Sequence, residues 1–327
     1  MLTALGTLLL GVPFARPCDT PVHQFALQNW VRGPYVLLYV GEGEAPQVVA
    51  KPVAELAYAN LVLKSARPGE LAESENTALR AAWQRHAEGG APFFALLSPA
   101  GAVIHAGTVV ESDLIAVTHS PARERLTGQI LHGKQGVLLL LECSDDKENS
   151  RAGRVLKHAV ARAAERSVAV GSVVVRRDDP RETWLVRQLL AVESDLAGID
   201  KPMIFGVFGR GYALPPYLGK GITDPNICDL VAFMNGPCTC EIKAATEGVD
   251  LLTAFDWDAA VIALQAGTTT EEDAMSPPAV IAGERTSSLA PARQERPTRT
   301  GRNVALLVGL VLVLMTAVAA TMFLRSR

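Results

Sequence analysis

A short pattern that predicts a β-hairpin occurs twice in this 327-residue chain. Each copy has a proline, an apolar run, a glycine turn nine residues after the proline and a second short run. The first copy runs from Pro92 to its turn at Gly101, and the second from Pro202 to its turn at Gly211. Runs of strand-forming residues on either side of a glycine turn are typical of hairpins. The spacing therefore predicts a duplicated structural unit.

The elements predicted around the first hairpin follow the order strand, helix, strand, helix, strand, strand, helix. They are a strand over 35–40, a weak helix carrying Pro46 and Pro52, a strand over 60–64, a helix capped by Ser74 or Asn76 and stopped at Gly89, the hairpin over 92–106, and a helical segment over about 110–132 broken near Pro121. Alternating strands and helices within about 100 residues favour a sheet covered by helices on both faces.

The second half repeats this order. It comprises a strand over 136–143, a helix capped by Ser150 and running to 166, a strand over 168–175, a helix starting at Asp179, the hairpin over 202–217 and a helix over 224–235. Residues 248–264 form a short extension that the pattern does not assign to an element.

Seven elements in this order, together with the matched prolines Pro92 and Pro202, resemble the thioredoxin-like superfamily. The resemblance covers residues 30–135 and 136–243 and implies an α/β fold with two tandem thioredoxin-like domains, placed at 18–135 and at 136–265 with the extension included. In that superfamily the proline is usually cis and faces the active site, so cis peptide bonds are expected at Pro92 and Pro202. The competing interpretation is two unrelated α/β units that are alike by chance.

The position of the redox centre lacks its usual pair of cysteines. In thioredoxin-like enzymes that pair follows the first strand at a helix N-terminus, which lowers the thiol pKa. The first repeat has Gly41-Glu-Gly-Glu-Ala-Pro46 there, and the second has Cys143 followed by acidic residues, which would raise a thiol pKa. Cys143 is interpreted as a packing residue at a strand end, with a one-cysteine redox site as the alternative. The sequence thus favours a protein without catalytic residues over an enzyme.

Cys238 and Cys240 form a second pattern with several possible meanings. Thiols two residues apart can form a strained, readily reduced disulfide, bind a soft metal, pair with other cysteines or remain inert. We favour structural disulfides or inert thiols over a redox pair, and a redox pair over a metal site. The chain has five cysteines, so one stays unpaired unless it bonds to another chain.

Several function classes are disfavoured. The net charge is −3 and the basic residues are scattered, so nucleic acid is not an expected partner. The six histidines lack metal-ligand spacing, and the glycines at 209–211 and 218–222 lack the spacing of a phosphate-binding loop. No cofactor and no metal site are predicted.

Both ends of the chain suggest a membrane protein. Residues 304–324 are uncharged and, at 1.5 Å per residue, match a hydrocarbon core of about 30 Å, which predicts a transmembrane helix. A polar tether over 266–303 precedes it. Residues 1–17 resemble a signal peptide but lack a basic start, so a misassigned start or an uncleaved strand or helix are alternatives.

The predicted topology follows the signal peptide. It places residues 18–303 outside the cytoplasm, although four arginines between 293 and 302 favour the opposite orientation. The resulting hypothesis is a single-pass membrane protein of a bacterial-type envelope. Its thioredoxin-like domains would be catalytically inactive and would bind a protein partner in a membrane complex. The alternatives are a membrane-tethered thiol oxidoreductase using Cys238 and Cys240, and a tail-anchored cytoplasmic adaptor.

Overall fold

The computed structural model describes residues 20–87, 92–237, 243 and 247–266. The chain divides into two units, Met1–Ala279 and Val280–Arg327, and everything described here belongs to the first. The predicted signal peptide, nearly all of the tether and the predicted transmembrane run at 304–324 lie outside the described residues. Within the described residues, no helix has the length and apolar character needed to cross a bilayer.

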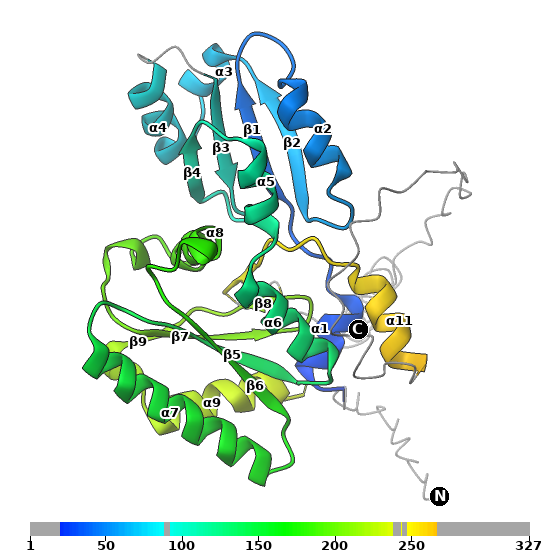
Figure 1. Cartoon of the computed structure of the whole chain (residues 1–327), viewed down its shortest axis with the longest axis vertical. Helices are drawn as coiled ribbons and strands as arrows, with labels where there is room; N and C mark the ends of the chain where they lie inside the picture. The colour runs from blue at the N-terminus through cyan, green and yellow to red at the C-terminus, as the bar shows by residue number, and fades with distance from the viewer. Residues whose placement is uncertain (1–19, 88–91, 238–242, 244–246, 267–327) are drawn as a thin grey trace, which may run out of the picture. The chain divides into compact units, whose positions relative to one another are not determined.

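The first sheet has four strands in the order β2-β1-β3-β4 (Figure 1). The strands are β1 (Tyr35–Val40), β2 (Leu61–Ala66), β3 (Phe93–Leu97) and β4 (Val103–Gly107). β1 runs parallel to β2 and antiparallel to β3, and β3 runs antiparallel to β4. This is the predicted strand–helix–strand unit followed by the predicted hairpin.

Helices cover both faces of the first sheet. They are α2 (Gln47–Glu55), α3 (Pro68–Ala72), α4 (Thr77–Ala87) and α5 (Glu111–Thr118). Successive strand residues point to opposite faces, so Phe94 packs with Leu114 of α5 and its neighbour Phe93 packs with Leu79 of α4. Asn76 caps α4, because its side-chain oxygen accepts from the Leu79 amide at 3.0 Å.

The second sheet repeats the arrangement and extends it. Its strands are β5 (Gly136–Leu141), β6 (Val170–Val175), β7 (Met203–Phe208), β8 (Tyr212–Ala213), β9 (Tyr217–Leu218) and β10 (Val249–Asp250). Their order is β10-β8-β7-β5-β6, and β9 pairs with β7. All six residues of β5 are buried, because Leu138 and Leu140 enter one core while Leu139 and Leu141 enter the other. A strand buried on both faces explains the unbroken apolar run in the sequence.

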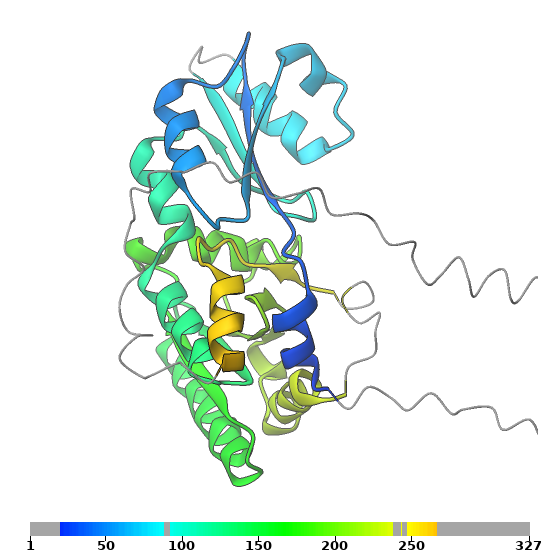
Figure 2. The same ribbon diagram turned by 90° about the vertical axis from the view of Figure 1, so that its right-hand side faces the viewer.

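The helices of the second sheet come from distant parts of the chain (Figure 2). They are α1 (Val22–Asn29), α6 (Pro121–Leu131), α7 (Asp146–Glu165), α8 (Thr183–Leu190), α9 (Asp224–Asn235) and α11 (Trp257–Ala266). Residues of α1, α7 and α9 build one core, and residues of α6, α8 and α11 build the other. Three short 3-10 turns complete the unit: η1 (Pro180–Glu182), η2 (Leu196–Gly198) and η3 (Gly219–Gly221).

The predicted element order is confirmed in both repeats, with some corrected boundaries. The helix predicted to be capped by Ser150 begins at Asp146, because Asp145 accepts hydrogen bonds from the amides of Lys147 and Glu148 at 2.8 and 3.2 Å. The segment over 110–132 splits into α5 and α6, since Ser120 caps a new helix that starts with proline. The sequence reading did not predict α1.

The extension after residue 247 is an integral part of the second sheet. Its strand β10 pairs with β8, and its helix α11 places Trp257 in the core with only 2% of its surface exposed. The indole nitrogen of Trp257 donates to Thr253 Oγ1 at 3.3 Å. The second α/β unit is therefore completed by a segment that follows its last predicted helix.

We predict that Trp257→Ala lowers the free energy of unfolding by about 3–5 kcal/mol, because it empties a packed site in the core. Ile262→Ala on the same helix is the control, since Ile262 is 66% exposed and its loss should change stability by less than about 0.5 kcal/mol. Urea unfolding monitored by far-UV circular dichroism, which reports secondary structure, measures the free energy of unfolding of both variants. Equal effects of the two substitutions would show that α11 is not packed as described.

Candidate functional site

The turn between β5 and α7 holds Cys143, at the position where the resemblance implied a redox motif. The Asn149 side chain closes this turn, accepting from the Cys143 amide and donating to the Cys143 carbonyl at 2.9 Å each. The Asp145 amide donates to Cys143 Sγ at 3.4 Å. Cys143 is partly exposed and forms no disulfide. The thiol therefore lies in a turn whose backbone is fixed by its neighbours.

A serine and an aspartate connect this turn to the segment that enters β7. The Ser144 amide donates to Asp200 Oδ1 at 3.2 Å, and the Ser144 hydroxyl donates to Asp200 Oδ2. These hydrogen bonds from Ser144 hold the pKa of the Asp200 carboxyl below its usual value. Because Asp200 lies two residues before Pro202, the structure brings the Cys143 turn and the Pro202 segment together.

An ion pair forms a second bridge between the same segments. Lys201 Nζ lies 2.8 Å from Glu148 Oε1 in the first turn of α7, and this contact raises the pKa of Lys201. Both bridges are at the surface, where a single pair contributes little stability. In these two bridges, Ser144 is bonded to Asp200 and Lys201 to Glu148, so the polar side chains around Cys143 are partners of one another.

The cis prediction is wrong for Pro202. The described residues contain no cis peptide bond, so the Lys201–Pro202 bond is trans. The trans isomer is the lower in energy, and here the chain continues directly into β7 while the Pro202 carbonyl accepts from the Gly219 amide at 2.9 Å. The bond preceding Pro92 involves Ala91, which lies outside the described residues.

The arrangement around Cys143 provides one thiol. Exchange between a dithiol and a disulfide requires a second thiol near the first, and the other free cysteine of the described residues, Cys228, lies within α9. Cys238 and Cys240 lie outside the described residues, so the structure does not test that pair. Among the described side chains, no group of three or more His, Cys, Asp or Glu could hold a metal ion.

The equivalent turn of the first sheet carries no thiol. It follows β1 from Gly41 to Pro46, and α2 begins there without a side-chain cap. Gly43 adopts a φ of 110°, a conformation that favours glycine. The glycines of this turn therefore serve its backbone shape.

Charged and amide side chains that the sequence did not single out are buried between the two sheets. Arg123 on α6 is 3% exposed, and its Nε donates to the Leu252 carbonyl at 3.0 Å. Burial lowers the pKa of Arg123 to about 10. Gln188 on α8 donates to the Val117 carbonyl at 3.3 Å and accepts from the Leu252 amide at 3.2 Å. The second repeat thus binds the backbone of the extension.

The first repeat binds the same extension from its own side. Arg32, just before β1, donates to the Thr253 carbonyl at 2.9 Å and to Asn60 Oδ1 at 3.1 Å. Asn60 in turn accepts from the Thr253 amide at 3.2 Å. Asp250 accepts from the Gly33 amide at 2.7 Å. Both repeats therefore hold residues 250–253 through side chains that the periodic pattern could not distinguish from surface polar groups.

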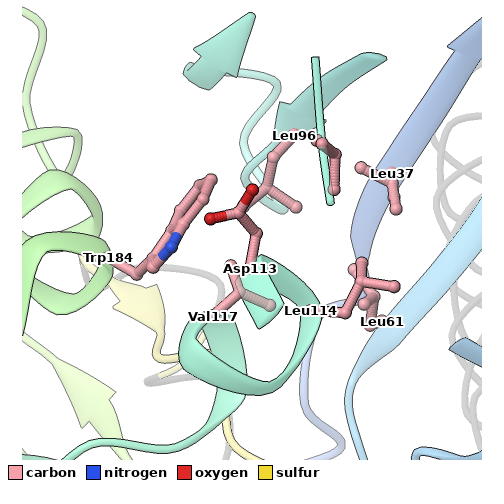
Figure 3. A pocket seen from close by; sticks show the side chains of 8 residues that line it. Leu37, Leu61, Leu96, Asp113, Leu114, Val117 and Trp184 are labelled. Atoms are coloured by element: carbon pink, nitrogen blue, oxygen red, sulfur yellow. The ribbon is translucent and has the colours of Figure 1, made fainter. Parts of the chain in front are cut away.

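A small apolar pocket lies between α5, the first sheet and α8 (Figure 3). It is lined by Leu37, Leu61, Leu96, Val109, Asp113, Leu114, Val117 and Trp184. The space measures about 240 Å³ including its open mouth, and Asp113 is its one charged wall. The Asp113 carboxylate is already used, because it accepts from the Val110 amide at 3.0 Å. The pocket is below the usual size of small-molecule sites.

No family model matches the chain, and no curated protein matches it. Among solved structures, the first two thioredoxin domains of Eps1p from Naumovozyma dairenensis are 13% identical, with a TM-score of 0.24, covering 70% of this chain and 100% of that one. The corresponding domains from Saccharomyces cerevisiae are 13% identical, with a TM-score of 0.23, covering 67% and 98%. TM-scores this low do not establish a shared fold.

We predict that Ser144→Ala raises the pKa of the Asp200 carboxyl, because it removes the hydroxyl that stabilises the charged form. A carboxyl with a depressed folded pKa contributes stability above its unfolded pKa and loses it as the pH falls through the folded value. The variant should therefore lose this contribution at a higher pH than the wild type. Carbon-13 NMR titration of the carboxyl measures the shift, with Ser112→Ala as an exposed control. An unchanged Asp200 titration would contradict the described bridge.

Proposed function

We propose that this protein is a membrane-anchored binding or assembly module, built on two thioredoxin-like domains that carry no redox chemistry and lie on the extracytoplasmic side. The observation that carries the proposal is the bridged turn at Cys143. Its single thiol has backbone partners, and its neighbour Ser144 is bonded to Asp200. A thiol is activated by a nearby cation or by a helix N-terminus. Here the helix end is capped by the Asp145 carboxylate, and Lys201, the cation near Cys143, is paired with Glu148 at 2.8 Å.

Two further observations support a binding role. Side chains from both repeats hold the same extension, which makes the two sheets suitable as one binding platform. Val110, the residue before α5, and Ile115, within α5, are each 58% exposed. Exposed apolar side chains can contact a protein partner. We place the partner surface at this end of α5.

Site-specific photo-crosslinking tests this function in the full-length protein in its native membrane. A photoreactive residue at Ile115 is expected to give a discrete protein adduct. The same probe at Val174, which is 44% exposed on β6, is the control and should give none. A probe at Ile115 that gives no adduct beyond that control would overturn the proposed surface.

The competing oxidoreductase requires Cys238 and Cys240 to cycle between dithiol and disulfide. We expect alkylation mass spectrometry across a glutathione titration to find no switching of this pair near the potentials of redox catalysts, which lie at about −120 to −270 mV. We also expect Cys143→Ser to retain the Ile115 adduct at wild-type yield. Reversible switching in that range would favour the oxidoreductase instead.

Orientation separates the proposal from a cytoplasmic adaptor. A C-terminal fusion to a reporter that works only in the cytoplasm should be active, because the predicted topology leaves the last residues inside. The same reporter inserted after residue 266, ahead of the predicted span, should be inactive. The reverse pattern would place the folded domains in the cytoplasm.

A further inference from the structure

The duplicated fold offers an internal comparison between two equivalent edge strands. β2 borders the first sheet and β6 borders the second, and each runs parallel to the central strand beside it. Leu61 is paired with the first residue of β1, and Val170 with the first residue of β5. Leu63 and Ser172 therefore occupy the same position in the two edges. An unprotected edge is a template for pairing with another strand.

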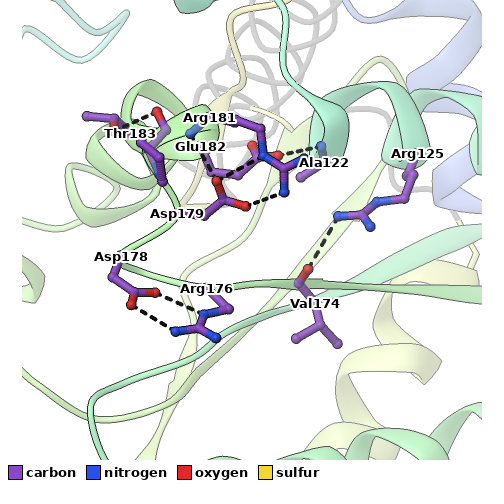
Figure 4. A network of polar contacts seen from close by, with 10 residues as sticks. Ala122, Arg125, Val174, Arg176, Asp178, Asp179, Arg181, Glu182 and Thr183 are labelled. Atoms are coloured by element: carbon purple, nitrogen blue, oxygen red, sulfur yellow. Dashed lines mark hydrogen bonds and ion pairs between the residues drawn. The ribbon is translucent and has the colours of Figure 1, made fainter.

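The edge formed by β6 is capped by side chains of α6. Gln129 Nε2 donates to the Ser172 carbonyl at 3.0 Å. Figure 4 shows the second contact, in which Arg125 Nη2 donates to the Val174 carbonyl at 3.5 Å. Gly171 is fitted to this cap, because a side chain there would overlap the Gln129 amide. These contacts occupy the outward carbonyls of Ser172 and Val174, so a strand added at this edge would find few free acceptors.

The corresponding edge of β2 is open. The carbonyls of Asn60 and Ala66 accept from the β1 side, at 2.7 and 3.1 Å. Because parallel strands alternate the direction of their backbone groups, residues 62 and 64 also face β1, while Leu61, Leu63 and Ser65 face outward. In the part of the chain that the structure describes, no group bonds to the outward backbone of these three residues.

Neighbouring elements define the length of this open edge. An antiparallel bridge joins Ala254 to Ala59, two residues before Leu61, and β2 ends at Ala66. The opposite border of the sheet, β4, is contacted by α4 and α8. The free backbone is therefore a short stretch with three outward residues.

We propose that this edge pairs with β2 of a second copy of the chain, antiparallel and across a two-fold axis at Leu63. In that register Leu61 faces Ser65 of the other copy and Leu63 faces its own counterpart, so every outward residue meets an outward residue. Pairs of this kind exchange both backbone hydrogen bonds, giving about six in total. A closed two-fold pairing is the commonest form of self-association.

The side chains are compatible with this register on both faces. Val62 is 41% exposed and would lie opposite Lys64 of the other copy, so the two lysines do not face each other. The aliphatic stem of a lysine can cover an apolar neighbour while its ammonium stays in water. Helix α2, which contacts β2, would lie beside its copy and carries Val48, which is 64% exposed. Pairing thus covers apolar surface on the two faces.

The small contact predicts a weak dimer in solution and a stronger one on a membrane. Pairing of one short strand buries less than the roughly 1,200 Å² of a stable interface. Confinement of both copies to one bilayer would raise their effective concentration and compensate for this. The inference concerns self-association and does not depend on the partner surface proposed at α5.

Leu63→Pro tests the pairing in the full-length protein in detergent. The outward Leu63 amide makes no bond to β1, so proline removes the donor needed by the second copy while keeping the ladder within the sheet. Analytical ultracentrifugation should find a concentration-dependent dimer for the wild type and at least a roughly tenfold weaker dimer for the variant. Ser172→Pro, at the equivalent position of the capped edge, should dimerise as the wild type does.

Cross-linking provides a second readout that tolerates small changes in stability. Leu63→Cys, in a background with the five native cysteines replaced by serine, should form a covalent dimer with a short bis-maleimide, because about 5.5 Å separates the two-fold-related backbones. Ser172→Cys is the matched control and should remain monomeric. A wild type that is monomeric in detergent and also gives no Leu63→Cys dimer in membranes overturns the proposal, as does equal cross-linking of the two variants.

Discussion

The structure depends on the way in which both repeats bind one short segment, residues 250–253. Side chains of Arg32 and Asn60, beside the first sheet, and of Arg123 and Gln188, on helices packed on the second sheet, hold its amides and carbonyls. A buried polar group that loses its partner costs about 1–3 kcal/mol, so these contacts reinforce one arrangement of the segment. The apolar residues Leu251 and Leu252 are inserted at the same place, in cores of the second and the first sheet respectively.

Because both repeats contact the same segment, they do not behave as two independent domains joined by a linker. The last part of the folded chain completes the second sheet through β10, and at the same time it forms contacts with the first repeat. The turn at Cys143 lies on this framework, with its polar groups bonded to Asp200 and Asn149.

The two repeats also differ in the protection of their sheet edges. α6 protects β6 through Gln129 and Arg125, whereas the first repeat presents the open backbone of β2. Duplicated elements can diverge in this way because a cap needs only one or two side chains on a neighbouring helix. The same fold thereby provides one closed edge and one open edge.

The order of strands and helices in each repeat and the duplicated hairpins could be predicted from the sequence, because hydrophobic periodicity, prolines and glycine turns act locally. The helix over 224–235 was also predicted, whereas Cys143, predicted at a strand end, lies in the turn two residues after β5. That Arg123, Gln188 and Asn60 are buried partners of one backbone segment could be seen only from their contacts in the fold, since an arginine or an amide reads as a surface group until its contacts are known. The Ser144–Asp200 bridge likewise joins residues 56 positions apart in the chain. Such contacts leave no periodic signal in the chain, which is why the scaffold was predictable and its site was not.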